Sequence, residues 1–527
     1  MPETCLYVFN PDEWDRKYRR SSSVEGVWKC PHEAFSDRDY CLFHLPPEER
    51  KKVGVSPEVV RDEFMNAVAS EDKSKNKFIG GRFRELDLEH QDVETAGRYP
   101  VDMRHTVIEG QVNLSDAYFD MPVFMDHSVF ESQLEAIGTE FGSACSFVDV
   151  TFDRINFDGA IFNNEVDFHD AVFEETVDFT DILVERNMDF HNAVFEKNVD
   201  FRLSEFNGNV NFKNASFRGE SDFIESVFKL EANFADATFG ENTVFRYTEF
   251  RDSAIFRNTT FNGNVNFRKA SFDSETDFRH SNFSRWVVFH NTTFQGRSDF
   301  EGAVFVGDTD FTETEFFQDV NLSNTTFRSK VSLEVEPMED EVMVDMEGSD
   351  LSRGYIREPE NGRVFYDLSH GTLGDVDLRK PQSWREDENL LDYFLLYDTE
   401  YEGFDFREHR DDLSKRKWRI HTAEIGDREL EPHFLMNTYQ YATRAAREVR
   451  DRKIANKFYI RYKKYKRQVH RRDMLESDSV ATRVRGVGRW LGNFVLDITV
   501  GYGKKPWRVL PILVVIGLIA AYMMNLI

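Results

Sequence analysis

The chain has 527 residues, with 95 acidic against 66 basic side chains and a formal net charge of −29. This length allows about three or four domains, and the charge argues against general nucleic-acid binding, because phosphates would be repelled. Acidic residues occur in most segments, which favours a carboxylate-solvated surface, as in a salty cytoplasm, over one acidic partner face.

Three of the four cysteines lie near the N-terminus, and a histidine follows the third at a spacing that lets both reach one ion. These side chains are Cys5, Cys30, Cys41 and His44. A Cys3His set suits tetrahedral zinc with closed coordination. We therefore expect residues 1–50 to hold a structural zinc, which would staple a segment too poor in apolar residues to fold alone. His32 is a further candidate ligand.

The alternative for this segment is three ordinary buried thiols beside an exposed histidine. Disulfides are not expected, because no signal-peptide pattern precedes the cysteines and the chain has the character of an intracellular protein. Residues 51–106 are charged and mixed, and we interpret them as a connector. A short helix is predicted over 59–70, with Val60, Phe64, Ala67 and Val68 on one face.

Phenylalanine recurs from Phe157 to Phe327 at alternating intervals of five and six residues, with Val184 and Leu322 filling two of the slots. A fixed period of this kind indicates a solenoid. The triplets that end in Phe alternate inward, outward and inward, as in a strand, and polar or glycine residues follow them. Four such sides of a square coil need about 22 residues, and coils would stack about 4.8 Å apart.

We therefore predict a β-solenoid over residues 107–335, with the first coil near Val107. Cys145 is expected to lie in the core of the solenoid. The fragments "VNFKNASFRGESDF" and "VDFHDAVFEETVDF" resemble the Phe-centred form of the pentapeptide-repeat family. The resemblance implies a right-handed quadrilateral β-helix, so the chain is expected to be mainly β. The alternatives are a different β-solenoid or a sandwich of short strands. The phrase "CPHEAF…YCLFHLP" is similar to an N-terminal knuckle of family members that have a membrane tail.

Charge is uneven along the repeats. Residues 151–200 carry a balance of −10, whereas residues 251–300 carry +2. A differently charged face is therefore expected near Arg251, Arg257, Arg268, Lys269, Arg279 and Arg285.

The C-terminal third changes character. Residues 336–429 are predicted to be a mixed segment that caps the solenoid, because an open last coil exposes strand edges. Residues 388–421 resemble a stretch of channel-tailed members of the family. Residues 430–475 show helical spacing in two stretches separated at 450–452, which predicts a helical hairpin with a basic end.

Seven Lys or Arg and no acid occur in residues 461–472, which suggests contact with anionic lipid. Residues 476–508 are predicted to be an amphipathic segment at a membrane interface, and residues 509–527, without charge, a transmembrane helix. The interface residues would be Trp490, Trp507 and Arg508. The basic side would stay in the cytoplasm, which predicts a single-pass protein of the cell membrane with a cytoplasmic N-terminal bulk.

Residues 499–503 read Thr-Val-Gly-Tyr-Gly, the letters of a potassium selectivity filter. No span precedes them, and two lysines follow where channels usually have an acid. They resemble instead the run that leads into the first of two spans in channel-tailed members, so a working filter is not expected.

The sequence thus favours a non-enzymatic, membrane-anchored scaffold that displays its solenoid to an unknown protein partner or to a second copy in a homo-oligomer. The first alternative is a subunit, or a truncated form, of a pentapeptide-repeat channel with a two-helix pore. The second is an acidic DNA mimic that regulates a topoisomerase. No phosphate loop, hydrolase zinc helix or triad spacing is found, so no enzyme and no cofactor other than the structural zinc is expected.

Overall fold

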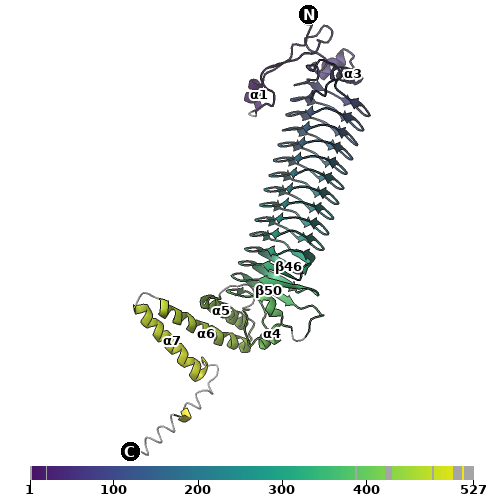
Figure 1. Cartoon of the computed structure of the whole chain (residues 1–527). Helices are drawn as coiled ribbons and strands as arrows, with labels where there is room; N and C mark the ends of the chain where they lie inside the picture. The colour runs from purple at the N-terminus through teal and green to yellow at the C-terminus, as the bar shows by residue number, and fades with distance from the viewer. Residues whose placement is uncertain are drawn as a thin grey trace, which may run out of the picture. The chain divides into compact units, whose positions relative to one another are not determined.

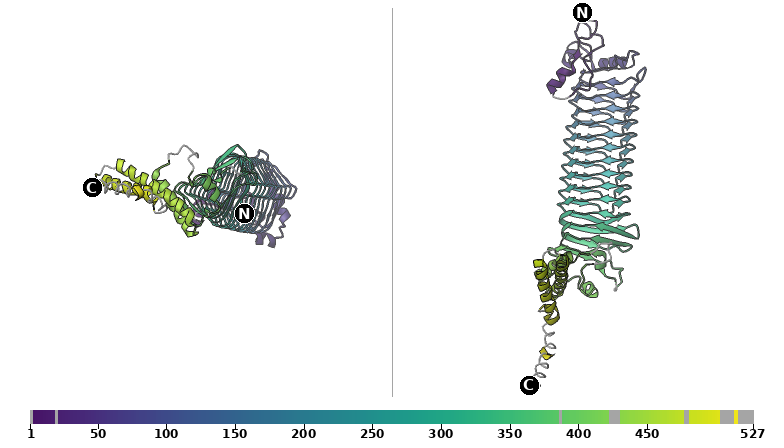
Figure 2. Two further views of the ribbon diagram at one scale, coloured as in Figure 1. Left: turned by 90° about the horizontal axis from the view of Figure 1, so that it is seen from below. Right: turned by 60° about the vertical axis from the view of Figure 1, so that its left-hand side comes forward.

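A computed structural model describes residues 3–18, 21–385, 388–421, 430–476, 480–502 and 513–515 (Figures 1 and 2). The chain divides into two compact units, Met1–Gln318 and Asp319–Ile527. The first unit contains an N-terminal cap and most of a β-solenoid. The second contains longer strands followed by helices.

The solenoid of the first unit has four sides, each a column of two-residue parallel strands that pair with the strand one turn, usually 22 residues, further on, as Val166 pairs with Met188. Column A holds β6 (Val101–Asp102), β10 (Val123–Phe124), β14 (Cys145–Ser146), β18 (Val166–Asp167), β22 (Met188–Asp189), β26 (Val210–Asn211), β30 (Ala232–Asn233), β34 (Ala254–Ile255), β38 (Thr276–Asp277) and β42 (Ser298–Asp299). Column B holds β3 (Arg82–Phe83), β7 (Val107–Ile108), β11 (Val129–Phe130), β15 (Thr151–Phe152), β19 (Val172–Phe173), β23 (Val194–Phe195), β27 (Ser216–Phe217), β31 (Thr238–Phe239), β35 (Thr260–Phe261), β39 (Asn282–Phe283) and β43 (Val304–Phe305).

The other two sides follow the same rule, and a longer strand, β44 (Thr309–Phe316), serves both of them at the end of the unit. Column C holds β4 (Leu86–Asp87), β8 (Val112–Asn113), β12 (Leu134–Glu135), β16 (Ile155–Asn156), β20 (Val177–Asp178), β24 (Val199–Asp200), β28 (Ser221–Asp222), β32 (Thr243–Val244), β36 (Val265–Asn266) and β40 (Val287–Val288). Column D holds β5 (Asp92–Val93), β9 (Tyr118–Phe119), β13 (Glu140–Phe141), β17 (Ile161–Phe162), β21 (Leu183–Val184), β25 (Glu205–Phe206), β29 (Val227–Phe228), β33 (Glu249–Phe250), β37 (Ser271–Phe272) and β41 (Thr293–Phe294).

The phenylalanine side chains form the core of these coils, as the period predicts. Phe190, Phe212 and Phe234 are fully buried, and their rings stack one above another at centroid distances of 5.0 and 4.9 Å. Small inward residues complete the interior, and many buried hydroxyls donate to the carbonyl of the coil before, as Ser204 does to Phe179 at 2.7 Å. Because each coil buries its rings against two neighbours, the coils stabilise one another.

The corners depend on polar side chains and on backbone with positive φ. The Asp178 carboxylate accepts a hydrogen bond from the backbone N–H of Thr180 at 2.9 Å, which holds the chain in its turn. Asn192, at φ 58°, donates from its side chain to Asp170 in the coil before. At Gly208 a Cβ atom would lie 2.2 Å from the carbonyl carbon of Arg186, so this turn requires glycine.

The solenoid begins earlier than predicted, at β3 rather than near Val107. The first coils place other apolar side chains in the slots that Phe occupies later, and a count of Phe alone misses them. These side chains are Leu88, Val93, Met103, Ile108 and Leu114, all buried.

The N-terminal cap comprises a two-stranded antiparallel ribbon and three helices. Its elements are β1 (Val8–Phe9), α1 (Pro11–Tyr18), β2 (Trp28–Lys29), α2 (Pro47–Lys52) and α3 (Pro57–Val68). The predicted helix is confirmed: α3 buries Val60, Phe64, Ala67 and Val68. Phe64 packs on Phe78, at a ring distance of 4.7 Å, and so helps to close the first coil.

In the second unit, strands pair in parallel in two columns. The first column holds β45 (Val320–Asn321), β47 (Glu341–Asp345), β49 (Arg363–Asp367) and β51 (Phe394–Leu395). The second column holds β46 (Thr326–Pro337), β48 (Asp350–Arg357), β50 (Thr372–Arg379) and β52 (Glu400–Tyr401). The helical elements are η1 (Leu390–Tyr393), α4 (Arg410–Lys415), α5 (Pro432–Glu448), α6 (Arg452–Glu476) and α7 (Val480–Val500). Strands therefore continue through much of the predicted capping segment. Leu435 of α5 packs on Leu395 and Tyr397 and so covers the last strands. The predicted hairpin is α5 and α6.

Over the described ranges, no helix is both long enough and apolar enough to cross a bilayer. The predicted transmembrane helix and the predicted single-pass topology are therefore wrong. The longest helices, α6 and α7, carry charges along their length. Of the predicted span 509–527, only 513–515 are described; the rest lies outside the described residues.

Candidate metal centre and displayed surfaces

The structure brings the four predicted ligands together in the N-terminal cap. All four side chains are buried, and their ligand atoms lie within 4.8 Å of one another. Cys5 and Cys30 lie on the two sides of the ribbon, where the Cys5 N–H donates to His32 and the Cys30 N–H to Tyr7. Cys41 and His44 lie on one turn, in which the His44 N–H donates to the Cys41 carbonyl at 3.2 Å.

The distances fit a tetrahedral ion. The Sγ atoms of Cys30 and Cys41 are 3.7 Å apart, and Nδ1 of His44 lies 3.8 Å from Sγ of Cys5 and 3.2 Å from Sγ of Cys41. Zinc–sulfur bonds of about 2.3 Å at tetrahedral angles place sulfurs about 3.8 Å apart. The four residues could therefore hold zinc without large movement, and all four positions would be filled by protein.

The surroundings of His44 prepare its Nδ1 atom for an ion. Nε2 lies 2.9 Å from the carbonyl oxygen of Ile79, so Nε2–H donates there and Nδ1 keeps its lone pair. The Tyr7 ring stacks on the imidazole at 4.0 Å. Burial, with the nearby Cys30 and Cys5 sulfurs, raises the pKa of Tyr7 to about 12, so this ring stays neutral.

The clustered thiols shift one another's pKa values. Hydrogen bonds from Cys30 and Cys41 lower the pKa of Cys5, while the bonds to Cys41 and Cys5 raise the pKa of Cys30. Cys145 differs, because it lies alone in column A, where burial only raises the pKa of its thiol. Thiolate is the form of cysteine that binds a divalent cation, and bonds to the metal would replace the hydrogen bonds between these sulfurs.

His32, the further candidate, is not a ligand. Its Nε2 atom contacts the Lys77 carbonyl at 3.0 Å, and its ring stacks on Phe78 at 5.2 Å. Burial lowers the pKa of His32 to about 4, so it is a neutral core residue. His32 therefore lies between the cluster of Cys5, Cys30, Cys41 and His44, called the metal cluster below, and the aromatic side chains that close the first coil.

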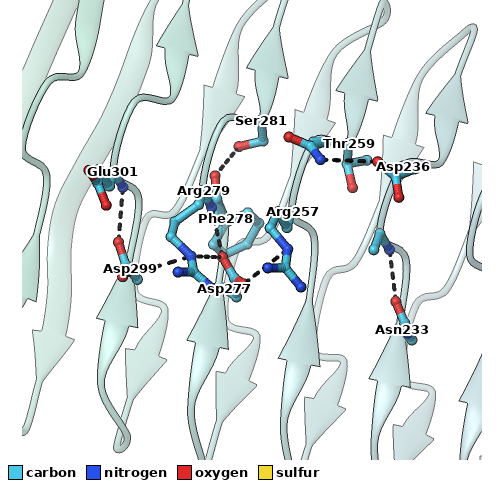
Figure 3. Close-up of polar contacts among 12 residues, drawn as sticks. Asn233, Asp236, Arg257, Thr259, Asp277, Phe278, Arg279, Ser281, Asp299 and Glu301 are labelled. Carbon is cyan, nitrogen blue, oxygen red and sulfur yellow. Dashed lines mark hydrogen bonds and ion pairs between the residues drawn. The ribbon is translucent and has the colours of Figure 1, made fainter.

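The expected basic face around residues 251–285 is not one face. Arg251 follows column D, Arg285 follows column B, Arg268 and Lys269 follow column C, and Arg257 and Arg279 follow column A. The two arginines after column A moreover share one carboxylate, Asp277, as Figure 3 shows. Arg279 donates to Asp277 at 2.8 and 2.9 Å, and Arg257 lies 3.7 Å from it.

The ends of the column C strands and the corner that follows them carry a row of carboxylates that we call the acidic ridge: Asp158, Asp178, Asp181, Asp200, Asp222 and Glu225. Burial and the charges of its neighbours Asp178, Asp181 and Asp200 raise the pKa of Asp158. Arg202 pairs with Asp200 at 2.6 Å and approaches Asp222. Further along the same corner the charge reverses, where Lys269 and Arg246 lie over the Tyr247 ring.

Leu203 lies in the middle of the acidic ridge and is not among the residues predicted from the sequence. It has φ 61° and is 53% exposed, between Asp181 one coil before and Glu225 one coil after. A bulky apolar residue is rarely found in this backbone conformation, which Asn, Asp and Gly favour. Alignment of the repeats at 22 residues would have shown leucine where Asp and Glu occur.

The predicted interface residues are only partly described. Trp490 lies on α7, half-buried, with its ring stacked on Phe494 at 5.4 Å. Trp507 and Arg508 lie outside the described residues. The filter-like run begins as the last turn of α7, and the Tyr502 hydroxyl donates to Asn493 of the same helix, so these residues, as far as described, are a helix end.

Comparison with known proteins supports the interpretation of the repeats. The profile of the family described as pentapeptide repeats (9 copies) matches residues 136–183, 190–238, 201–249, 223–270, 245–293 and 289–334. The solenoid therefore carries pentapeptide repeats over these residues. No curated protein matches the chain, and neither does any solved structure. The resemblance of the C-terminal third to channel-tailed members has no support from these comparisons.

Proposed function

We propose that this protein is a non-enzymatic scaffold in which a metal-stabilised cap protects the first coil of a pentapeptide-repeat solenoid that displays a docking side to a protein partner. The observation that carries the proposal is Leu203, an exposed apolar side chain held in an unfavourable backbone conformation within the acidic ridge. The repeat imposes positive φ at this corner, as at Asp181 and Glu225, and a leucine there is the kind of strained residue that clusters at functional sites.

The chemistry of the acidic ridge indicates the partner. The six carboxylates of the ridge lie along the same side as the exposed Leu203, and Arg202 pairs with one of them, Asp200. A basic partner would gain both electrostatic steering and an apolar anchor at Leu203. The ridge ends where Arg246 follows, so it lacks the continuous acidic stripe that the DNA-mimic alternative requires. The predicted homo-oligomer stays a prediction.

A photo-crosslinking amino acid at position 203 tests this function in cells of the source organism. The matched control is the same replacement at Asn214, which also has positive φ, at 59°, but follows column A. We expect one defined crosslinked protein from position 203, lost when Asp181 and Glu225 are changed to Lys. Equal background from both positions would reject the ridge as a docking side.

The cap requires its own test, because zinc at Cys5, Cys30, Cys41 and His44 is part of the proposal. Purified protein should contain one equivalent of zinc, measured by mass spectrometry of the element. Metal at Cys3His would act structurally, since no ligand position stays open for a substrate. Protein that folds fully without metal would refute this part and leave the docking side untouched.

A second partner, anionic lipid, is favoured by one surface of α7. Val484, Val487, Leu491 and Val495 form an exposed apolar stripe, opposite Gly486, which packs on α6. α6 supplies the basic residues 461–472. Sedimentation with phosphatidylglycerol vesicles, compared with phosphatidylcholine vesicles, tests this contact. Binding should fail for the variant Leu491→Asp with Val495→Asp, and equal binding of that variant would dismiss lipid as the partner.

A further inference from the structure

A pocket of about 530 Å³ lies beside the metal cluster in the first unit. Its walls come from four separate segments: Trp28 and Lys29 of β2, Lys73 and Lys77 after α3, the stretch from Tyr99 to Arg104, and Phe124 of β10. This size is within the range of about 300–1,000 Å³ that small-molecule sites occupy.

The pocket is locally cationic in a chain with a net charge of −29. Lys29, Lys73 and Lys77 are exposed, and within the described part of the chain none of them has a carboxylate at ion-pair distance. The lining carboxylate, Asp102, is already occupied, because Arg104 donates to both of its oxygens at 2.8 and 2.7 Å. Three uncompensated ammonium groups thus surround one concave surface.

Aromatic side chains supply the remaining walls. Trp28 and Tyr99 line the pocket from different segments of the chain, and Lys73 lies 6.0 Å from the Tyr99 ring. Phe124 adds a third ring at an outward slot of column A, where the next coils have Ser146, Asp167 and Asp189. An aromatic residue in this slot breaks the polar pattern of the column where the pocket lies.

We infer that this pocket binds a nucleotide, with the phosphates on the lysines and the base against Trp28 and Tyr99. Ammonium groups bind phosphate as point charges, and flat rings stack on indole and phenol. Neither feature alone would select this ligand class, since a simple anion needs no rings and a neutral aromatic molecule needs no lysines.

The metal cluster would hold one wall of the pocket, a point that rests on the proposed zinc. Cys30 is a proposed ligand, and its two neighbours in the chain, Lys29 and Pro31, both line the pocket. Metal bound at Cys30 would fix the backbone that presents Lys29 and Trp28.

Isothermal titration of the full chain with ATP, adenosine and pyrophosphate tests the inference. We expect saturable one-to-one binding of ATP, at least tenfold tighter than that of adenosine or pyrophosphate. Changing Lys29, Lys73 and Lys77 to Ala together should weaken ATP binding at least tenfold, and Tyr99→Ala about fivefold. The control changes three exposed lysines elsewhere, Lys197, Lys213 and Lys269, to Ala and should leave binding unchanged.

The outcomes separate the two claims. No saturable ATP binding, or equal losses in the two triple variants, would overturn the nucleotide site. Binding of pyrophosphate as tight as that of ATP would also overturn it, because the rings would then contribute nothing. Zinc content is measured in the same samples, so a failed nucleotide site in metal-loaded protein leaves the metal site standing.

Discussion

The Phe-stacked coils and the N-terminal cap, both in the first unit, achieve order by opposite means. In the coils, each ring is one of many equivalent contacts, such as Phe212 between Phe190 and Phe234. In the cap, four side chains meet at one point, within 4.8 Å of one another. Repetition spreads stability over many neighbours, whereas a closed ligand set concentrates it in one place.

The largest expected effect comes from placing a charge inside the repetitive region. Phe212→Asp buries a carboxylate between two stacked rings and should destabilise the coils around it by more than about 4 kcal/mol. Loss of β circular dichroism and of cooperative melting would show it. Lys213→Asp, one residue on and exposed, is the control and should melt normally. Normal melting of Phe212→Asp would contradict the shared core.

Breaking the cap should have a large but local effect. Cys41→Ser removes one ligand, so we expect loss of bound zinc and of hydrogen-exchange protection in the ribbon β1–β2, while the coils beyond Phe147 keep theirs. Cys145→Ser removes a buried thiol that lies outside the cluster. That control should keep its zinc, and equal zinc content in both variants would end the metal-centre hypothesis.

A smaller effect of opposite sign is expected at Leu203. Leu203→Asn places a residue that tolerates positive φ at φ 61° and should stabilise the solenoid by about 1 kcal/mol. Leu230→Asn, at an exposed leucine without positive φ, should change stability little. Chemical denaturation measures both. A stabilised Leu203→Asn protein would support the strain at this position, whereas a destabilised one would contradict it.

The smallest effect concerns pH. The pKa of Asp158 is raised by burial and by its carboxylate neighbours, so the folded chain binds this proton more tightly than the unfolded chain. Its ionised form therefore destabilises the fold at neutral pH, and this penalty disappears as pH falls below the raised pKa. Asp158→Asn should thus stabilise slightly at pH 7 and not at pH 3.

Asp277 provides the opposite sign for the same experiment. Burial opposes its ionisation, but the hydrogen bonds from Arg279 prevail and lower its pKa, so its stabilisation is present at neutral pH and lost as pH falls through the lowered value. Asp277→Asn should therefore destabilise at pH 7. Parallel pH profiles for the two variants would contradict the assigned environments.

Features that depend on residues close together in the sequence were predicted, and features that depend on distant residues were not. The period of Phe correctly places the side chains from Phe157 to Phe327 inside the coil. Strand alternation and the length of a turn depend on residues close together in the sequence, so they can be predicted from it. The proximity of Cys41 to His44 was predictable for the same reason, since only two residues lie between them. The start of the solenoid was misplaced because Val93 and Met103 serve as core residues without belonging to the Phe pattern.

By itself, the sequence determined the repeat, the inward positions and the membership of the Cys3His cluster. The tertiary structure decided the rest: that the arginines of 251–285 are divided among four sides, that Leu203 lies within the acidic ridge, and that Lys29, Lys73 and Lys77 surround one pocket. These groupings join residues many positions apart, and only the closed coil and the docked cap bring them into contact. Periodicity reports which way a side chain points, whereas its neighbours depend on how the whole chain packs.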